Sequence, residues 1–286
     1  MSVVERRKRT PPVALSIGGS DSGAGAGIQA DMKAFAANKV FGTTVITAVT
    51  AQNTQGVQAT HTLTGDLVSA QIKSVVSDFM VRAVKTGMLA TKENVLVVAD
   101  YAARGAFERL VVDPVLVSSS GTRLLDKSAE AAYLERLIPR ATLITPNLHE
   151  VKSLLGKLPS NYEEMIGAAR EFKKMGPRYV LIKGGHLHGN ESTDIFYDGQ
   201  TILKLSAQRI QTDNVHGTGC TLSAAITANL ARGMDVVEAV KTAKIYITRT
   251  IKAGSLWQLG RGSGPVDQFI WASQEDMNSI PIESAN

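Results

Sequence analysis

Five short runs rich in β-branched residues punctuate most of this chain, and stretches with helical spacing lie between them. The runs do not alternate apolar with polar residues, and continuous apolar strands of this kind are buried on both faces, as in a parallel sheet. This repeated alternation of strand and helix predicts an α/β fold with a doubly wound sheet and right-handed crossovers. The expected strands cover residues 13–17, 44–49, 109–115, 141–146 and 179–183, and the expected helices cover residues 28–38, 66–77, 91–103, 127–138, 147–155 and 161–174.

The last third of the chain departs from this alternation. Asp198-Gly199 lies between two strand-like runs, which predicts an antiparallel hairpin near residues 193–206 at an edge of the sheet. Two helices are expected after it, over residues 218–232 and 235–252, because a glycine separates them and glycine commonly follows the end of a helix.

The domain organisation and the charge of the chain bear on its partners. We expect residues 1–12 to be a basic, disordered tail and residues 13–286 to be a single domain, since no linker or repeat divides them. The formal charge of +5 raises the alternative of a nucleic-acid contact through that tail, but no nucleic-acid-binding module occurs, so we expect no such partner. No apolar run reaches the roughly 20 residues that span a bilayer, and the start of the chain lacks an apolar leader. With one cysteine, which permits no disulfide within the chain, we expect a cytoplasmic protein with no membrane partner.

A glycine-rich segment follows the first expected strand. Residues 18–31 hold five glycines within ten positions, with Ser20 and Asp21 among them. Glycines let the backbone approach a ligand closely, and their exposed N–H groups can hold an anion. A dinucleotide-binding GxGxxG motif does not fit, because Ile28 stands where the third glycine belongs. We predict a ligand-binding loop here, and the alternative is an ordinary flexible turn.

Two further segments that follow strands carry candidate substrate contacts. Gln52 and Asn53 come after the second strand and offer the donors and acceptors that suit the edge of a heteroaromatic ring. Met88 follows another short strand, where the alternatives are the lining of an apolar pocket and plain core filling. Ligands of doubly wound sheets bind at the carboxyl ends of the strands, and both segments are expected there.

Carboxylates follow two later strands. Asp113 ends a strand before a proline, and Asn147 and Glu150 lie three positions apart at a helix start, on one face. Residues so placed suit Mg²⁺, which uses few protein ligands and keeps waters and phosphate oxygens. The alternative for Glu150 is a favourable charge near a helix N-terminus.

The segment IKGGHLHG, residues 182–189, offers two further kinds of chemistry. Lys183 ends a strand before two glycines and is a candidate phosphate contact. His186 and His188 suggest zinc, but no fixed third ligand accompanies them, so we do not expect a zinc site.

The only cysteine, Cys220, ends a Gly-Thr-Gly turn at an expected helix start. Unpaired N–H groups at such a helix end form an anion site, and they can stabilise a phosphoryl group during its transfer. The same helix dipole predicts a lowered pKa for the thiol. The alternative for Cys220 is simple packing. Neither a Walker A sequence nor a protein-kinase catalytic loop occurs, so phosphoryl transfer would use another architecture.

Eight segments of the chain carry a resemblance when they are taken in order. They are ALSIGGSDSGAGAGIQADMKAF, VTAQNTQGVQ, KTGML, VVDPV, LITPNLHE, IKGGH, NVHGTGCTLSAA and GPVDQF. Together they closely resemble the hydroxymethylpyrimidine/phosphomethylpyrimidine kinases of thiamine biosynthesis, in the ribokinase-like superfamily, from about Pro12 to Phe269. The resemblance implies a ribokinase-like fold and phosphorylation of 4-amino-5-hydroxymethyl-2-methylpyrimidine, and then of its monophosphate, by ATP with Mg²⁺.

Motif matching extends the resemblance to single residues. It implies that the pyrimidine lies among Gly19, Asp21, Ala26, Gln52, Met88 and Val115. It implies nucleotide contacts from Asn147, Lys183, Thr212, Gly217 and Gly219, and Mg²⁺ held by Asp113 and Glu150. Most members of the superfamily have an aspartate base at the end of the turn, where this chain has Cys220; Gly217, Gly219 and Lys183 would stabilise the transferring phosphoryl group.

The resemblance leaves alternatives and departures. Pyridoxal or pyridoxine kinase is the alternative activity, because a vitamin B6 branch also ends its turn with cysteine, and a non-catalytic nucleotide or pyrimidine binder is the alternative of another class. The family often has threonine where Val215 stands and a basic residue where Asp213 stands, which puts the local phosphate contacts in doubt. Ribokinase-like relatives are commonly dimers, so we expect a homodimer.

Overall fold

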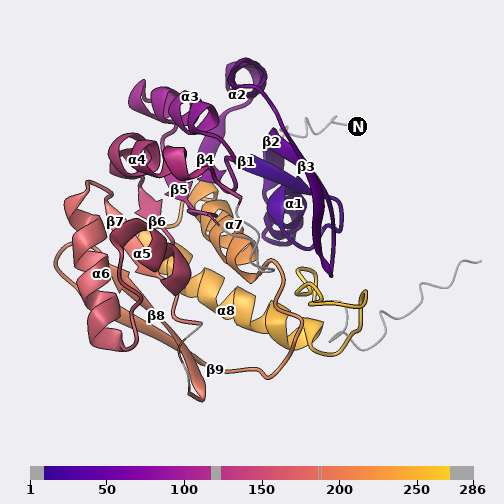
Figure 1. The fold of residues 1–286 in the computed structure, drawn as a ribbon, viewed down its shortest axis with the longest axis vertical. Helices are drawn as coiled ribbons and strands as arrows, with labels where there is room; N and C mark the ends of the chain where they lie inside the picture. The colour runs from indigo at the N-terminus through magenta and orange to yellow at the C-terminus, as the bar shows by residue number, and fades with distance from the viewer. Residues whose placement is uncertain (1–9, 117–123, 186, 188, 271–286) are drawn as a thin grey trace, which may run out of the picture.

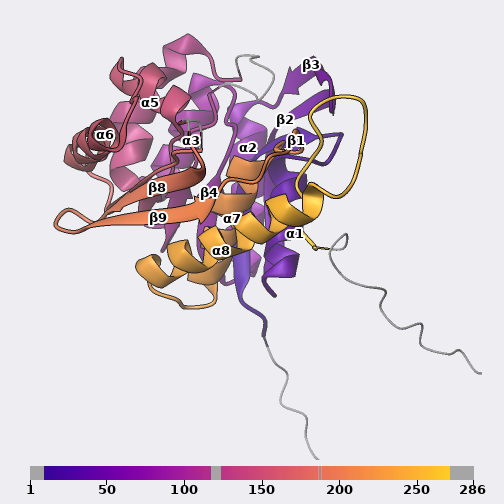
Figure 2. The ribbon, with the colours of Figure 1, turned by 90° about the horizontal axis from the view of Figure 1, so that it is seen from below.

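The computed structural model describes residues 10–116, 124–185, 187 and 189–270, which form one sheet between two layers of helices (Figure 1, Figure 2). The strands are β1 (Val13–Asp21), β2 (Phe41–Asn53), β3 (Gly56–Thr62), β4 (Val81–Thr86), β5 (Leu110–Val112), β6 (Leu143–Ile144), β7 (Tyr179–Ile182), β8 (Glu191–Tyr197) and β9 (Ile202–Gln208). Their order across the sheet is β3-β2-β1-β4-β5-β6-β7-β8-β9. The run from β2 to β7 is parallel, whereas β3 pairs antiparallel with β2, and β8 pairs antiparallel with both β7 and β9. The predicted mostly parallel α/β fold is confirmed.

Helices cover both faces of the sheet. One face carries α1, α7 and α8, and the other carries α2 to α6 (Figure 2). The helices are α1 (Gly27–Ala37), α2 (Gly65–Asp78), α3 (Lys92–Ala103), α4 (Glu130–Ala132), α5 (Leu148–Leu155), α6 (Tyr162–Lys174), α7 (Thr218–Ala231) and α8 (Val236–Gly254). Short 3₁₀ and π turns flank α4, so that residues 127–140 wind as one irregular helical segment.

The two cores explain why the strands are continuously apolar. In β1, Leu15 and Ile17 face the layer of α2 to α6, whereas Ala14, which precedes Leu15, faces the layer of α1, α7 and α8. Successive side chains of a strand point to opposite faces, so a strand covered on both faces buries every side chain. Each large aliphatic side chain buried in this way contributes roughly 1.5–3 kcal/mol.

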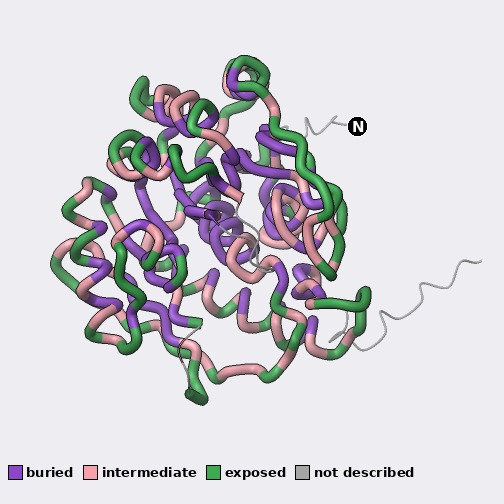
Figure 3. Tube along the Cα trace, in the orientation of Figure 1, coloured by how far each residue is buried: buried purple, intermediate pink, exposed green. Residues whose placement is uncertain are grey.

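Helix α7 lies at the centre of the molecule and brings its N-terminus to the carboxyl edge of the sheet. It is buried from Thr221 to Ala231 (Figure 3). Its many alanines let the backbone approach the sheet closely, and α7 packs against β4, β1 and β5 as well as α1 and α8. The turn before α7 is therefore fixed relative to the strand ends around it.

The two edges of the sheet differ in how well the sequence predicted them. The expected hairpin near residues 193–206 is confirmed as β8 and β9, with Asp198 and Gly199 between them. At the other edge, β2 extends to Asn53 and turns into β3, which was not expected. Strand β3, GVQATHT, is exposed along most of its length (Figure 3) and lacks the apolar residues that mark a buried strand.

Both ends of the chain lie outside the part that the structure describes. Residues 1–9 and 271–286 lie outside the described residues, so the division into a tail over 1–12 and one domain over 13–286 stays a prediction. Within the described part of the chain, no helix combines the length and apolar character that a bilayer span requires.

Candidate active site

Three segments from distant parts of the chain pack together at the carboxyl edge of the sheet. Gly217, the N-cap of α7, has φ of +78°, and a Cβ there would overlap the carbonyl oxygen of Gly25 in the β1–α1 loop. A Cβ on Gly25 would in turn overlap the ring of His216. A Cβ on Gly219 would lie 3.2 Å from Nζ of Lys183, which follows β7. The structure thus joins the glycine-rich loop, the glycine turn and the lysine that the sequence singled out separately.

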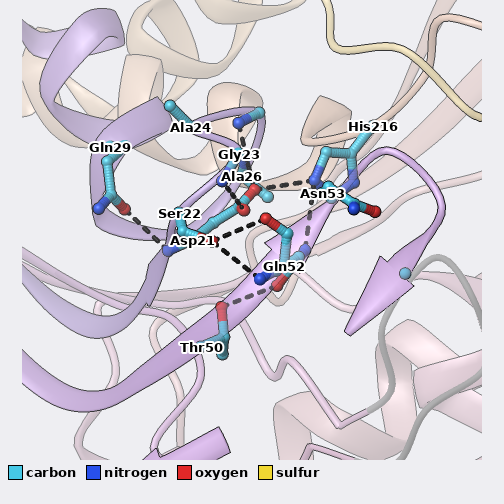
Figure 4. A network of polar contacts seen from close by, with 12 residues as sticks. Asp21, Ser22, Gly23, Ala24, Ala26, Gln29, Thr50, Gln52, Asn53 and His216 are labelled. Carbon is cyan, nitrogen blue, oxygen red and sulfur yellow. Dashed lines mark hydrogen bonds and ion pairs between the residues drawn. The ribbon is translucent and has the colours of Figure 1, made fainter. Parts of the chain in front are cut away.

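Asp21 organises the β1–α1 loop from within. One carboxylate oxygen accepts from the amide of Gly23 at 2.8 Å, and the other accepts from the amides of Gly25 at 3.1 Å and Ala26 at 2.8 Å. The second oxygen also lies 2.9 Å from Nε2 of His216 (Figure 4). Burial opposes ionisation of Asp21, but the bonds from His216 and Ala26 hold its pKa below the usual value. The carboxylate is therefore an anion that shapes the loop, and its predicted contact with a substrate stays a prediction.

Gln52 meets His216 at the open side of this network. Thr50 donates to the side-chain oxygen of Gln52 at 3.1 Å, and the Gln52 nitrogen lies 3.4 Å from Nε2 of His216 (Figure 4). When Nε2 of His216 donates to Asp21, it cannot also accept from Gln52, so that amide can turn its N–H to a ligand. The sequence did not nominate His216 as a site residue; its place beside the glycine turn was the available indication.

An apolar patch lies beside this loop. Met88 is buried, and a Cβ on Gly19 would overlap its methyl group. Ala48 and Ala90 pack against Met88, and Val115 packs against this cluster. Three predicted substrate residues, Gly19, Met88 and Val115, are therefore neighbours, as an apolar wall for a flat ring requires.

The charged residues after β5, β6 and β7 form a second cluster. Nζ of Lys183 donates to Asp113 at 2.7 Å and lies 3.9 Å from Glu150. Asp113 also accepts from Thr145 at 3.2 Å and from Ser223 of α7 at 2.9 Å. Both carboxylates are buried, whereas 12% of the Lys183 side chain is exposed. The lysine is thus the member of the cluster with most access to an incoming phosphate.

Burial affects the two carboxylates differently. It opposes ionisation of Asp113, but the Lys183 and Lys85 charges hold the pKa of Asp113 below its usual value. Burial raises the pKa of Glu150 to about 7, which the more distant Lys183 only partly offsets. Two carboxylates suit a magnesium ion that arrives on nucleotide phosphates. The described residues contain no group of three or more His, Cys, Asp or Glu that would form a metal site built from protein alone.

Asn147 and Thr212 have structural partners of their own. Asn147 caps α5: its side chain accepts from the Glu150 amide at 2.9 Å, and the Glu150 carboxylate accepts from the Asn147 amide at 2.7 Å. Asn147 also pairs with Lys183 in a parallel bridge, so it lies in the charged cluster. The hydroxyl of Thr212 accepts from the amide of Asn214 at 3.1 Å, and within the described part of the chain it makes no hydrogen bond to Lys183. Their contacts with a nucleotide stay predictions.

Cys220 corrects one sequence expectation. We predicted that the helix dipole lowers the pKa of its thiol, and this is wrong: burial raises the pKa to about 11. The nearby Lys85 charge opposes this rise, the carboxylates of Asp31 and Asp113 add to it, and a bond from the Gly27 amide opposes it. Desolvation of the thiolate therefore outweighs the helix terminus.

The sequence did not predict that residues 261–266 bond to His216 and to the β2–β3 turn. The amide of His216 donates to Gly264 at 3.0 Å, and Val266 donates back to His216 at 3.3 Å. The amides of Arg261 and Gly262 both donate to Thr54 in the β2–β3 turn at 3.1 Å. These contacts tie residues 261–266 to the rim of the loop network. His186 and His188, considered for zinc, lie outside the described residues.

Comparison with known proteins places this geometry in a family. The family model described as phosphomethylpyrimidine kinase matches residues 21–267. A hydroxymethylpyrimidine/phosphomethylpyrimidine kinase of Rhizobium meliloti is 50% identical over 90% of this chain and 97% of its own length. A chloroplastic thiamine biosynthetic bifunctional enzyme of Arabidopsis thaliana is 45% identical over 98% of this chain, which spans 54% of that enzyme. The solved pyridoxal kinase of Bacillus subtilis in complex with ADP matches with a TM-score of 0.84 and 37% identity, over 91% of this chain and 98% of that one.

These matches place the chain among the ATP-dependent kinases with a ribokinase-like fold, the class that the resemblance of its motifs implied. Within that class, the chain belongs to the phosphomethylpyrimidine kinase family.

Proposed function

We propose that this protein transfers the γ-phosphoryl group of ATP to the hydroxymethyl oxygen of 4-amino-5-hydroxymethyl-2-methylpyrimidine, and then to the resulting monophosphate, in thiamine biosynthesis. The observation that carries the proposal is the packing of the Gly217 turn against both the β1–α1 loop and Lys183. A phosphate held at that turn would lie between the apolar patch and the charged cluster. The names of the relatives from Rhizobium meliloti and Arabidopsis thaliana support the same substrate and pathway.

The acceptor pyrimidine fits the loop side of the site. Met88 and Val115 would provide the apolar wall, and Gly19 packs so closely against Met88 that a side chain at position 19 would overlap it. Gln52 would bond the ring edge, because an amide donates and accepts as an aminopyrimidine does. Asp21 and Ala26 would position the loop backbone against the substrate.

The nucleotide fits the turn and the charged cluster. The amides from Gly217 to Cys220 lie at the N-terminus of a 14-residue helix, where an anion is favoured. Asn147, Lys183 and Thr212 would contact the phosphates or their surroundings, and Gly219 would let a phosphate oxygen approach the backbone. Asp113 and Glu150 would help hold Mg²⁺, which would neutralise phosphate charge when bound. Of the two, Asp113 is the readier ligand, because its pKa is the one held low.

In this site the γ-phosphoryl group would move from ATP to the hydroxymethyl oxygen of the acceptor. The hydroxymethyl oxygen bonds to the γ-phosphorus while the bond from that phosphorus to the bridging oxygen breaks, and ADP leaves with the electron pair. The hydroxyl proton would pass to the sulfur of Cys220 after the thiol has released its own proton to solvent; because the pKa of the thiol is about 11, this thiolate is a small fraction of the enzyme at neutral pH. Lys183 and the Gly217 turn would stabilise the charge on the transferring group.

Parallel assays of ATP turnover test this proposal. We expect ADP release with the hydroxymethylpyrimidine and with its monophosphate, and loss of both signals when EDTA removes Mg²⁺. Substrate-free enzyme measures the background, and phosphorylated product identified by mass excludes uncoupled ATP hydrolysis. Turnover of pyridoxal without turnover of either pyrimidine would refute the assignment.

Pyridoxal kinase is the second candidate, and a specific observation favours keeping it. The match to the Bacillus subtilis pyridoxal kinase covers 98% of that protein, at 37% identity. The higher identity of 50% to the Rhizobium meliloti enzyme favours the pyrimidine. Both rings carry a hydroxymethyl group, so the ratio of kcat/KM values for the two acceptors is the quantity that separates them.

The role of Cys220 has its own test. If the thiolate accepts the proton, Cys220→Ala should lower kcat on the order of 10²- to 10⁴-fold. Cys220→Asp should recover part of that loss, because a carboxylate at this position can accept the same proton. Near-wild-type kinetics of the alanine variant would reduce Cys220 to a packing residue.

Two further parts of the proposal concern the protein in the cell. We propose a cytoplasmic homodimer, because a single cysteine fits a reducing compartment and ribokinase-like relatives are commonly dimers. Sedimentation equilibrium at several concentrations measures the mass, and a monomer throughout would contradict the dimer.

A further inference from the structure

A second lysine–aspartate pair lies beneath the glycine turn. Lys85, in β4, donates to Oδ2 of Asp31, in α1, at 2.9 Å, and each side chain is 1% exposed. Ser16, in β1, donates to the same oxygen at 2.6 Å. Oδ1 of Asp31 is buried and has no hydrogen-bond partner among the described residues. The pair is therefore sealed from solvent and held by three elements of the fold.

Helix packing places this pair close to Cys220. Cys220 lies in the first turn of α7, and α7 packs against both α1, which carries Asp31, and β4, which carries Lys85. The Lys85 ammonium and the Cys220 thiol interact electrostatically. A Cβ on Gly87 would lie 3.2 Å from Nζ of Lys85, so the ammonium lies beside the segment that follows β4.

A buried ion pair is weak evidence for stability, because apolar residues of similar volume often stabilise a core as well or better. The position of this pair therefore suggests a role in the site. We propose that Lys85, held by Asp31, is a positioning residue that supplies a fixed positive charge to the anionic form of Cys220 during proton transfer. This inference rests on the proposed role of Cys220 in the reaction.

Four charged groups face the thiol: Lys85 from β4, Asp31 from α1, Asp113 after β5, and Lys183 after β7. The two carboxylates disfavour a thiolate. Lys183 is bonded to Asp113 and is proposed to contact the phosphate, so these two groups already offset much of its positive charge. Lys85 has no such access because it is sealed, and its effect on Cys220 is through its field alone.

The single cysteine makes a direct test possible, because any alkylation of the chain reports on Cys220. Lys85→Met removes the charge and keeps most of the stem. We expect the rate of alkylation by iodoacetamide at about pH 9, followed by intact mass, to fall about tenfold, since one pKa unit changes the thiolate fraction tenfold. The whole pH profile should move to higher pH, which a purely structural role for Lys85 would not produce.

Two variants control for damage to the fold. Lys85→Met/Asp31→Asn removes both charges and keeps the side-chain shapes, and its profile should move in the same direction but less, because Lys85 lowers the pKa of the thiol more than Asp31 raises it. Lys244→Met removes another largely buried pair, since Lys244 donates to Asp194 at 2.8 Å and the side chains are 11% and 6% exposed. Its profile should match the wild type, because this pair does not face Cys220.

The outcomes separate this inference from the proposed substrate. The thiol measurement needs neither ATP nor a pyrimidine, so it stands even if the enzyme acts on another acceptor. An unchanged profile in Lys85→Met, with circular dichroism showing a folded protein, overturns the inference. An equal shift in Lys244→Met also overturns it, because the effect would then follow from the loss of any buried pair.

Discussion

Two lysine–aspartate pairs of nearly equal length each interact electrostatically with Cys220 at the start of α7, and they differ in access to solvent. Lys183 and Asp113 are 2.7 Å apart with 12% of the lysine exposed, whereas Lys85 and Asp31 are 2.9 Å apart with 1% of each side chain exposed. The first pair can meet a phosphate directly, and the second can act only at a distance. The exposed fraction of the lysine, more than the residue type, therefore separates the pair proposed to contact a phosphate from the pair proposed to change the pKa of Cys220.

The largest expected difference between the pairs is in catalysis. Lys183→Met removes the charge that would meet the phosphoryl group, and we expect kcat to fall on the order of 10²- to 10³-fold, as when one preorganised donor is lost. Lys85→Met should lower kcat by only about tenfold, since it acts through the field on Cys220. Steady-state kinetics with saturating ATP measures both. Equal losses in the two variants would contradict the distinction between contact and field.

The order should reverse for stability. Lys85→Met leaves Asp31 buried without its partner, and we expect the free energy of unfolding to fall by about 3–5 kcal/mol. Lys183→Met should destabilise less, because its pair is more exposed and Asp113 keeps the hydroxyls of Thr145 and Ser223. Urea denaturation followed by circular dichroism gives both values, and a larger loss for Lys183→Met would break the comparison.

Glu150 adds a pH dependence to the exposed pair. The folded protein holds a proton on Glu150 up to a pKa of about 7, whereas an unfolded chain releases it near 4.5, so stability falls as pH rises between these values. The difference corresponds to roughly 3 kcal/mol for this buried group. Glu150→Gln should flatten the stability curve between pH 4.5 and 7. Denaturation midpoints at several pH values measure it, and an unchanged slope would assign the dependence to other groups.

The smallest expected effect belongs to a pair whose lysine bonds no residue of the site. Lys244→Met removes the partner of Asp194, and we expect kcat and KM to stay within about twofold of the wild type, because Lys244 donates only to Ser192 and Asp194. The Gly184 amide keeps its bond to Asp194 in this variant. A large loss of activity would show that the chain after Lys183 depends on Lys244.

The sequence predicted the fold well where burial decides it. Strands β1 and β7 are continuous apolar runs covered on both faces, and the hairpin of β8 and β9 is marked by Asp198-Gly199. Strand β3 escaped prediction, because an exposed edge strand needs no apolar pattern and is defined by its pairing with β2. Strands β5 and β6 are shorter than expected, since the chain leaves the ladder within three residues and two residues, respectively.

The site was predicted by segment better than by role. Gly19, Met88 and Val115 are neighbours as expected, and Lys183 meets Asp113, which no local pattern could reveal across 70 positions. The expected effect of the helix on Cys220 was wrong because the sequence does not show how deeply a group is desolvated. The structural use of Asp21 by its own loop was equally hidden, since its partner His216 lies 195 residues away.

The contact of Gly217 with the Gly25 carbonyl has a consequence for how such chains diverge. Neither glycine can acquire a side chain while the other loop stays in place, since each Cβ would overlap the opposite loop. Substitutions on the acceptor side and on the phosphate side are therefore tied to each other across nearly 200 positions of sequence. A lineage that changes its acceptor is therefore expected to do so through residues beside this glycine contact, such as Gln52, whose amide lies 3.4 Å from the His216 ring, and to leave the contact itself unchanged.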